Sequence, residues 1–213
     1  MTTNNVSQQT NLDAALEYAK EGWPVLPLRG KIPLTKHGVK DATRDVTQIT
    51  EWWRRWPDAN IGLATGEASG WLVLDVDIKK GKRGDESLCA LEEEHGPLPK
   101  TRHSVTASGG SHYVFRMPDY PVKSRNGFRE GLDLLSDGKY FVAPPSTIDG
   151  VAYHWTDTCE AAPCPSWLAA LGDRSSTPQV APSENRIPEL IRELFPEGKE
   201  SNGNWITHCP LPW

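Results

Sequence analysis

The sequence has little that would place it in a membrane or outside the cell. No apolar run in its 213 residues approaches about 18 residues, and its first residues are polar. We therefore expect neither a transmembrane helix nor a secretion signal. The four cysteines, Cys89, Cys159, Cys164 and Cys209, are scattered and too few for a disulfide scaffold, so a reducing cytoplasm is the expected compartment. Cys159 and Cys164 lack a second pair that would complete a metal site, and we interpret them as structural.

The chain also lacks an excess of positive charge. Its net charge of −5 argues against a protein that coats nucleic acid by bulk electrostatics. Basic residues are nevertheless concentrated locally: residues 29–44 hold five basic side chains and one acidic, and residues 116–129 hold four and one. This distribution favours a local site for an anionic ligand.

The most informative stretch runs from Trp71 to Asp77, where a mostly apolar run of residues leads into two carboxylates. An apolar run of this length predicts a buried strand. Residues two apart on a strand share a face, so Asp75 and Asp77 should project together while Leu72, Leu74 and Val76 point into a core. Paired carboxylates resist ionising together unless a cation lies between them, and Mg²⁺ or Mn²⁺ suits such oxygen ligands.

Two further stretches add to this pair. Residues 108–112 read Ser-Gly-Gly-Ser-His between two runs typical of strands, which predicts a hairpin turn whose glycines let backbone N–H groups approach an anion. His112 would begin the return strand beside that turn. A third carboxylate, Asp133, lies in another apolar run, followed by an Asp-Gly turn and a strand that ends in Pro144-Pro145-Ser146.

In this order the motifs resemble the bifunctional primase-polymerase (Prim-Pol) branch of the archaeo-eukaryotic primase superfamily, found on phage and plasmid replication proteins. Asp75-Val76-Asp77 is similar to its first motif, residues 108–112 to its second, and Asp133 to its third acidic position. The likeness covers roughly Leu12 to Leu171 and includes Lys31-Ile32-Pro33, Asp41-Ala42-Thr43 and residues 60–66.

The resemblance implies an α+β archaeo-eukaryotic primase fold, with an RRM-like catalytic sheet packed with a smaller N-terminal α/β part. It implies template-dependent nucleotidyl transfer, as a DNA polymerase and primase, with a DNA template and primer and with dNTPs or NTPs as substrates. Two ions, Mg²⁺ or Mn²⁺, would be held by Asp75, Asp77 and Asp133, which with His112 form the catalytic set. The nucleotide-binding residues would be Ser108, Gly109, Gly110, Ser111, His112, Lys31 and Ser146.

Domain boundaries follow from composition. We expect a disordered N-terminus over residues 1–11, a catalytic domain over 12–172 and a Ser/Thr/Pro-rich linker over 173–184. Residues 185–213 would form a short helical segment and the start of a truncated zinc-binding module, with Cys209 as its first ligand. The chain would then be part of a longer replication protein, with further domains such as a helicase, in the cytoplasm of a bacterial or archaeal host.

Within the N-terminal part, Asp45 is placed to cap a helix on which Ile49, Trp52, Trp53 and Trp56 share one face. Such a tryptophan stripe can stack on bases, but its helical spacing favours core packing. Candidates for phosphate or template contacts are Lys31, Lys36, Arg125, Arg129 and Lys139.

Three other functions remain open from the residues. A metal-dependent nuclease or phosphoesterase would use the same carboxylates and histidine without nucleoside triphosphates. A glycosyltransferase could use Asp-x-Asp, although repeated βα units of a donor domain are missing. A non-catalytic single-strand-binding module of a replication protein would expose stacking aromatics on strand faces.

Overall fold

The computed structural model describes residues 10–79, 81–172, 199–201 and 204–206. Contacts divide the chain into two units, Met1–Arg174 and Ser175–Trp213. In the second unit the described residues form one antiparallel pair, β14 (Lys199–Ser201) with β15 (Asn204–Ile206). The predicted linker, the helix expected near residues 187–195 and Cys209 lie outside the described residues.

The first unit is an α+β domain built on two sheets, which confirms the predicted fold class at that level. All described strand pairs are antiparallel except β13 with β6. Its helices are α1 (Asn11–Lys20), the 3₁₀ helix η1 (Gly38–Asp41), α2 (Val46–Arg55), α3 (Gly84–His95) and α4 (Ser166–Ala170). Its strands are β1 (Val25–Arg29), β2 (Ile32–Pro33), β3 (Asn60–Ala64), β4 (Trp71–Val76), β5 (Arg102–Val105), β6 (Ser111–Arg116), β7 (Arg125–Arg129), β8 (Leu132–Leu135), β9 (Tyr140–Ala143), β10 (Thr147–Ile148), β11 (Val151–Ala152), β12 (His154–Asp157) and β13 (Ala162–Pro163).

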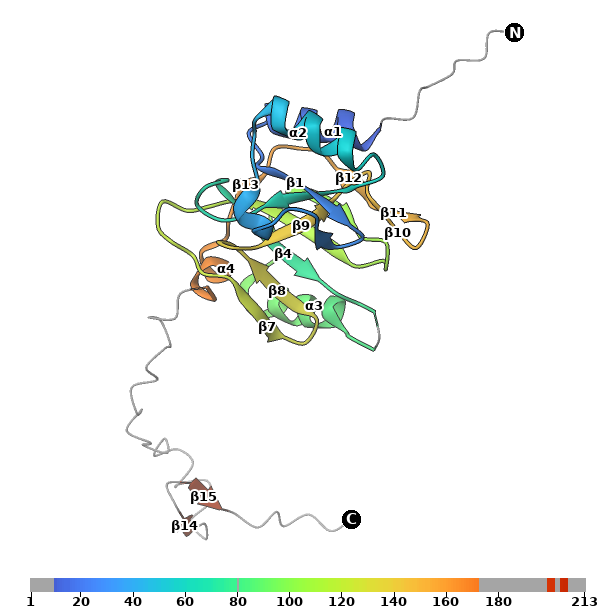
Figure 1. Ribbon diagram of the computed structural model, residues 1–213. Coiled ribbons are helices and arrows are strands. Elements are labelled where there is room, and N and C mark those ends of the chain that lie inside the picture. Colours follow the sequence, from blue (N-terminus) through green and yellow to red (C-terminus); the bar gives the residue numbers. More distant parts are fainter. Residues whose placement is uncertain (1–9, 80, 173–198, 202–203, 207–213) are drawn as a thin grey trace, which may run out of the picture. The chain divides into compact units, whose positions relative to one another are not determined.

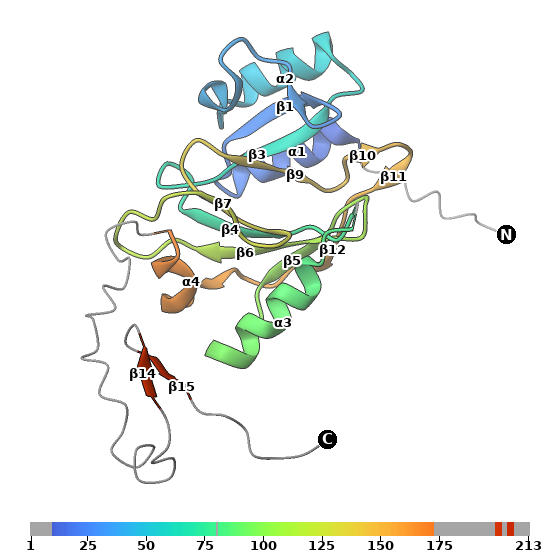
Figure 2. The ribbon, with the colours of Figure 1, turned by 90° about the horizontal axis from the view of Figure 1, so that it is seen from below.

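The smaller sheet has four strands in the order β2-β1-β3-β9, and the larger has the order β12-β5-β6-β4-β8-β7 with β13 beside β6. Figures 1 and 2 show α2 beyond the four-stranded sheet at one end of the domain, and α3 and α4 beyond the larger sheet at the other. The two sheets therefore lie between helical layers, with β4 in the middle of the larger one.

Alternation along β4 divides the core. Leu72, Leu74 and Val76 are buried with Leu88 and Leu91 of α3 in one cluster, as the sequence predicts. Val73, on the opposite face, belongs to a second cluster together with α1, α2 and the four-stranded sheet. The face that carries Val73 is therefore the face that carries Asp75.

The predicted cap at Asp45 is confirmed, because its side chain accepts hydrogen bonds from Thr47 N and Gln48 N at the start of α2. Thr10 and Asp13 form a capping box on α1 that was not predicted from the sequence. Residues 151–155 are divided between two sheets, because β11 pairs with β10 and β12 pairs with β5 of the larger sheet. No helix within the described residues is long and apolar enough to cross a bilayer.

Asn60 ties three distant segments together. Its buried side-chain amide donates to the carbonyls of Gly30 (3.1 Å) and Thr147 (2.7 Å), and its carbonyl accepts from Thr147 N (3.0 Å). We expect Asn60→Ala to lower the free energy of unfolding by about 2–4 kcal/mol, because buried backbone groups lose their partners.

Urea denaturation followed by tryptophan fluorescence measures this loss. Asn11→Ala is the matched control, because the Asn11 side-chain amide makes one hydrogen bond to the described part of the chain, to Ala59 O. A loss at Asn60 no larger than that at Asn11 would contradict the expectation.

Candidate active site

The larger sheet brings the predicted catalytic residues into one row. Asp75 of β4 is directly opposite His112 on β6 and directly opposite Asp133 on β8. Paired residues on neighbouring strands share a face, so the three side chains line up on the face that carries Val73. His112 Nε2 lies 3.6 Å from Asp75 Oδ1. The sequence placed these residues on separate strands, and the register makes them neighbours.

Asp77 continues the row just beyond the end of β4. Its N–H donates to Gly131 O (2.7 Å), which extends the pairing of β4 with β8 by one step. Gly84 and Gly131 let the chain pack this closely, since a Cβ on either would lie within 2.6 Å of Asp77 O. The Asp77 carboxylate contacts Lys82 Nζ at 2.7 Å and Lys79 Nζ at 3.8 Å.

The carboxylates in the row differ in their affinity for protons. Burial, followed by the charges of Asp77 and Asp133, raises the pKa of Asp75 to about 7. Burial also acts to raise the pKa of Asp77, but its hydrogen bond with Lys82 and the charges of nearby lysines lower that pKa overall. At neutral pH the Asp75 carboxyl is therefore only partly ionised, and a bound cation would stabilise its ionised form.

His112 is enclosed and neutral. Its ring lies between Phe141 (centroids 5.2 Å apart, edge-on) and Tyr153 (6.0 Å, stacked), and Nδ1 is 3.4 Å from Ser104 Oγ. Burial, helped by the charge of Lys31, lowers the pKa of His112 to about 3. The ring therefore acts as a neutral hydrogen-bonding group, with Nε2 directed at the acidic row.

The glycine turn between β5 and β6 is confirmed as a hairpin. Gly109 has a φ of +83°, and a Cβ on Gly110 would lie 2.3 Å from Val76 O, so the turn packs directly on the end of β4. Ser108 Oγ is 3.2 Å from Thr106 Oγ1. Ser111 is paired with Val76, whose side chain belongs to the opposite face, and its hydroxyl bonds with Tyr113 there. The structure therefore does not bring the Ser111 side chain to the row.

The two remaining predicted residues have different surroundings. Lys31 lies in the turn between β1 and β2, and its charge acts to lower the pKa values of Asp75, Asp77 and His112, so it interacts electrostatically with the row. Its carbonyl accepts a hydrogen bond from Tyr140 OH (2.8 Å). Ser146 is fully buried, and its hydroxyl accepts from Ile61 N (2.8 Å), so it supports the sheet and is not brought to the row.

Sequence reasoning missed four neighbours of the site: Ser104, Phe141, Tyr153 and Lys82. Phe141 and Tyr153 reach His112 from distant segments, which no local pattern reports, whereas Ser104 is directly opposite His112 in the hairpin of β5 and β6. Lys82 had a signal, because it lies in the short basic loop that follows Asp77.

The carboxylates fit a hard divalent cation in donor type and charge. Three carboxylates meet at one end of a buried strand, and burial together with their repulsion raises the pKa of Asp75. Among the described residues, however, no group of three or more His, Cys, Asp or Glu side chains is already arranged to hold a metal ion. Lys82 lies on Asp77, where a cation would bind, so the site has to rearrange when a metal enters.

Clustered carboxylates edged by lysines at a strand end are typical of metal-dependent enzymes that act on phosphate groups. The comparison with known families makes this class specific. The chain matches the family model described as Bifunctional DNA primase/polymerase, N-terminal (Prim-Pol), over residues 15–167. The match covers more than half of the chain, which belongs to this family, and the resemblance of the motifs is confirmed. No curated protein matches the chain.

Asp75 and His112 act in opposite directions on the stability of the metal-free protein. The folded state raises the pKa of Asp75 from 3.8 to about 7, so its contribution is present below about pH 4 and is lost as pH rises through 7. Folding lowers the pKa of His112 from 6.5 to about 3, so its contribution is present above about pH 6.5 and is lost as pH falls toward 3. Between about pH 4 and 6.5 the two slopes offset each other.

We therefore expect Asp75→Asn to make stability increase with pH in that window more steeply than in the parent, by up to about 1.4 kcal/mol per pH unit. His112→Asn should change the slope in the opposite direction. Urea denaturation with chelator at several pH values checks this, because other groups cancel in the comparison. Parallel curves for all three proteins would contradict it.

Proposed function

We propose that the domain catalyses template-dependent nucleotidyl transfer, as a DNA polymerase and primase in phage or plasmid replication, in the cytoplasm of the host cell. The observation that carries the proposal is the row of Asp133, Asp75 and His112 in register across β8, β4 and β6. The family match supports the reaction class. In this proposal the domain has the archaeo-eukaryotic primase fold: the larger sheet is the RRM-like catalytic half, and the four-stranded sheet with α1 and α2 is the smaller N-terminal part.

Asp75, Asp77 and Asp133 would hold two Mg²⁺ or Mn²⁺ ions. When bound, such ions neutralise the triphosphate and lower the pKa of the attacking 3′-hydroxyl. The protein's own part is positioning, since phosphoryl transfer needs alignment and charge neutralisation more than covalent chemistry. Asp75 binds its cation most readily above its raised pKa, because protons compete for the same oxygens.

The remaining side chains handle the nucleotide. Lys31, on the turn of the smaller sheet, interacts electrostatically with the row and would bind the triphosphate. His112, neutral, would donate one hydrogen bond from Nε2, while Ser104 and the rings of Phe141 and Tyr153 fix its orientation. Ser108 and the backbone of Gly109 and Gly110 form the adjoining wall. Ser111 and Ser146 support these elements from behind.

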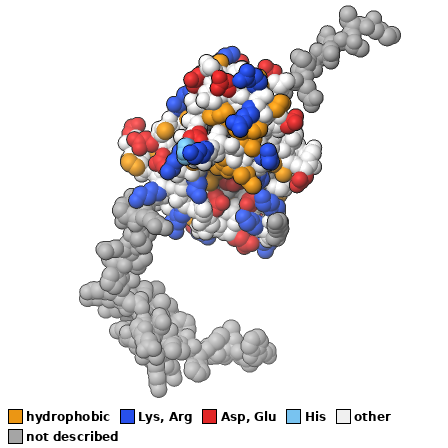
Figure 3. Space-filling model, viewed as in Figure 1, with side chains coloured by type: hydrophobic (Ala, Val, Ile, Leu, Met, Phe, Trp, Pro, Cys, Tyr) orange, Lys and Arg blue, Asp and Glu red, His pale blue; other side chains and the backbone are white. Residues whose placement is uncertain are grey.

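Contacts with DNA would be local. Figure 3 shows Lys and Arg side chains interspersed with Asp and Glu over the face seen in Figure 1, without a broad surface of one sign. This agrees with the net charge of −5. Binding would then depend on specific basic positions near the site and not on an extended electrostatic field.

Extension of a labelled primer on a recessed template, in Mg²⁺ and in Mn²⁺, tests the proposal. We expect template-matched extension by the parent and a loss of at least about 10²-fold in Asp75→Asn and Asp77→Asn, because each removes a metal ligand. Asp85→Asn is the control, since Asp85 is an exposed carboxylate in the first turn of α3.

Primer shortening without triphosphates, lost in the same variants, would instead establish a nuclease. DNA binding without either activity would leave a binding module and contradict the proposed chemistry. Unprimed synthesis on a single-stranded circle then tests the primase part separately.

Lys82 should compete with the metal for Asp77. A partly exposed ion pair contributes about 1 kcal/mol or less, so we expect Lys82→Met to tighten Mn²⁺ binding about two- to five-fold in the absence of nucleotide. Lys79→Met should have a smaller effect, because its ammonium is 3.8 Å from Asp77 and not 2.7 Å. A Mn²⁺ titration measures both, with Lys20→Met, whose partner is Glu17, as control. Weaker binding in Lys82→Met would contradict the competition.

A further inference from the structure

The tryptophan stripe on α2 serves two purposes. Ile49 and Trp53 are buried in the core, and Trp53 Nε1 donates to Ala59 O (3.1 Å). Trp52 and Trp56 lie on the same face of the helix but stay half-buried at its edge. The core therefore uses only part of the stripe, and two large aromatic side chains remain beside solvent.

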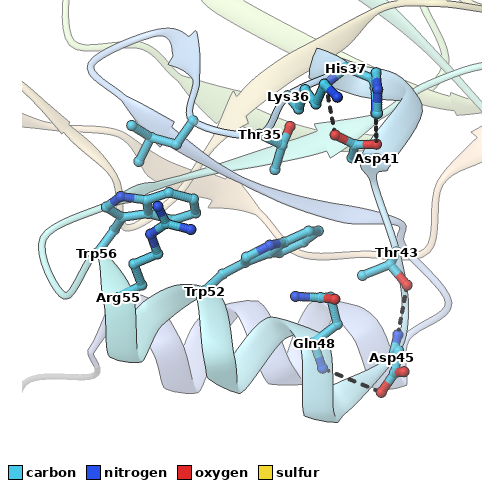
Figure 4. Close-up of a pocket in the computed structure, with 11 residues that line it drawn as sticks. Thr35, Lys36, His37, Asp41, Thr43, Asp45, Gln48, Trp52, Arg55 and Trp56 are labelled. Atoms are coloured by element: carbon cyan, nitrogen blue, oxygen red, sulfur yellow. Dashed lines mark hydrogen bonds and ion pairs between the residues drawn. The ribbon is translucent and has the colours of Figure 1, made fainter.

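These two tryptophans line a hollow of about 640 Å³ between α2 and the segment that leads from β2 through η1. Figure 4 shows both rings extending from α2 toward Thr35, with the Gln48 side chain beside the ring of Trp52. Neither the Trp52 ring nitrogen nor the Gln48 amide makes a hydrogen bond within the described residues. The hollow thus offers an aromatic surface with free polar groups at its edge.

Two exposed cations stand at the hollow, Lys36 and Arg55. Neither forms an ion pair within the described residues, and the Arg55 guanidinium lies over the Trp56 ring at 4.8 Å. The two carboxylates of the lining are already engaged: Asp41 accepts from His37 N (2.8 Å) and His37 Nδ1 (2.9 Å), and Asp45 caps α2. The free charge at this surface is therefore positive.

We propose that this hollow binds unpaired bases of single-stranded DNA, with a base stacked on Trp52 and the flanking phosphates on Lys36 and Arg55. Aromatic faces combined with cations that follow a backbone are how proteins hold single strands without regard to sequence. The Gln48 side-chain amide and the Trp52 ring N–H can form hydrogen bonds with a base, whereas an apolar ligand could not accept or donate them.

The inference rests on the proposed function, since a template-directed enzyme has to hold an unpaired template strand. The position of the hollow agrees with this use. Lys36 follows Lys31, whose charge acts on the catalytic row, by five residues, so their Cα atoms are at most about 18 Å apart. A short stretch of single strand can therefore contact both the catalytic row and the hollow.

Binding of a fluorescent oligo(dT) by the full chain, without metal or nucleotide, tests the inference. We expect Trp52→Leu, which keeps an apolar contact with the core, to weaken binding about five-fold or more, and Trp52→Phe to retain most of it. Lys36→Gln and Arg55→Gln should each weaken binding and reduce the slope of log K against log[salt] by about 0.7. Arg54→Gln is the matched control: the same charge change, on the neighbouring exposed residue of α2, outside the hollow.

Unchanged binding in Trp52→Leu and Arg55→Gln, or an equal loss in Arg54→Gln, would overturn the inference. An equal loss with duplex DNA of the same length would overturn it as well, because a duplex cannot present an unpaired base. The proposed function is judged separately by primer extension. If the parent extends primers and the hollow variants bind normally, only this inference fails. If extension fails while the hollow variants lose binding, only the proposed function fails.

Discussion

The structure depends on the register of β4 between its two neighbours. Antiparallel pairing with β6 and β8 places His112 and Asp133 on either side of Asp75, and a slip of β4 by one residue would turn Asp75 to the face opposite the other two. The register is held because Leu72, Leu74 and Val76 fill the cluster with α3 while Val73 fills the other. Apolar packing on both faces thus fixes the position of charges that repel each other.

That repulsion is only partly relieved within the domain. The pKa of Asp75 is raised to about 7, and the nearest basic ring, His112, is kept neutral by burial, so the histidine cannot balance the carboxylate. Partial compensation comes from lysines, whose side chains are long and flexible: Lys82 and Lys79 contact Asp77, and the charge of Lys31 acts on Asp75 and Asp77. Such charges can be displaced by a metal or can turn to a triphosphate, whereas a buried partner could not.

Local patterns predicted most elements of the fold and the members of the row. The apolar run ending in Asp75 and Asp77, the glycine turn before His112 and the cap at Asp45 depend on near neighbours in sequence. Contacts between distant segments could not be predicted in this way. Ser146 is at a motif-like position but its hydroxyl bonds to Ile61 N, and the rings around His112 come from β9 and the segment before β12. The helical spacing of the tryptophan stripe does not show which of its side chains are buried. Trp53 is buried and Trp52 and Trp56 are half-buried because of what packs against α2.

The segment from Arg29 to Arg44 contains both Lys31, whose charge acts on the acidic row, and Lys36, which lines the hollow on α2. At its start, the Asn60 amide donates a hydrogen bond to Gly30 O and the Tyr140 hydroxyl donates one to Lys31 O. These bonds from the four-stranded sheet fix the turn that carries Lys31. Further along, Lys36 reaches the hollow on α2. Lys36 follows Lys31 by five residues, so their Cα atoms lie at most about 18 Å apart. An extended anionic ligand, such as a single strand of nucleic acid, is long enough to span that separation and contact both lysines.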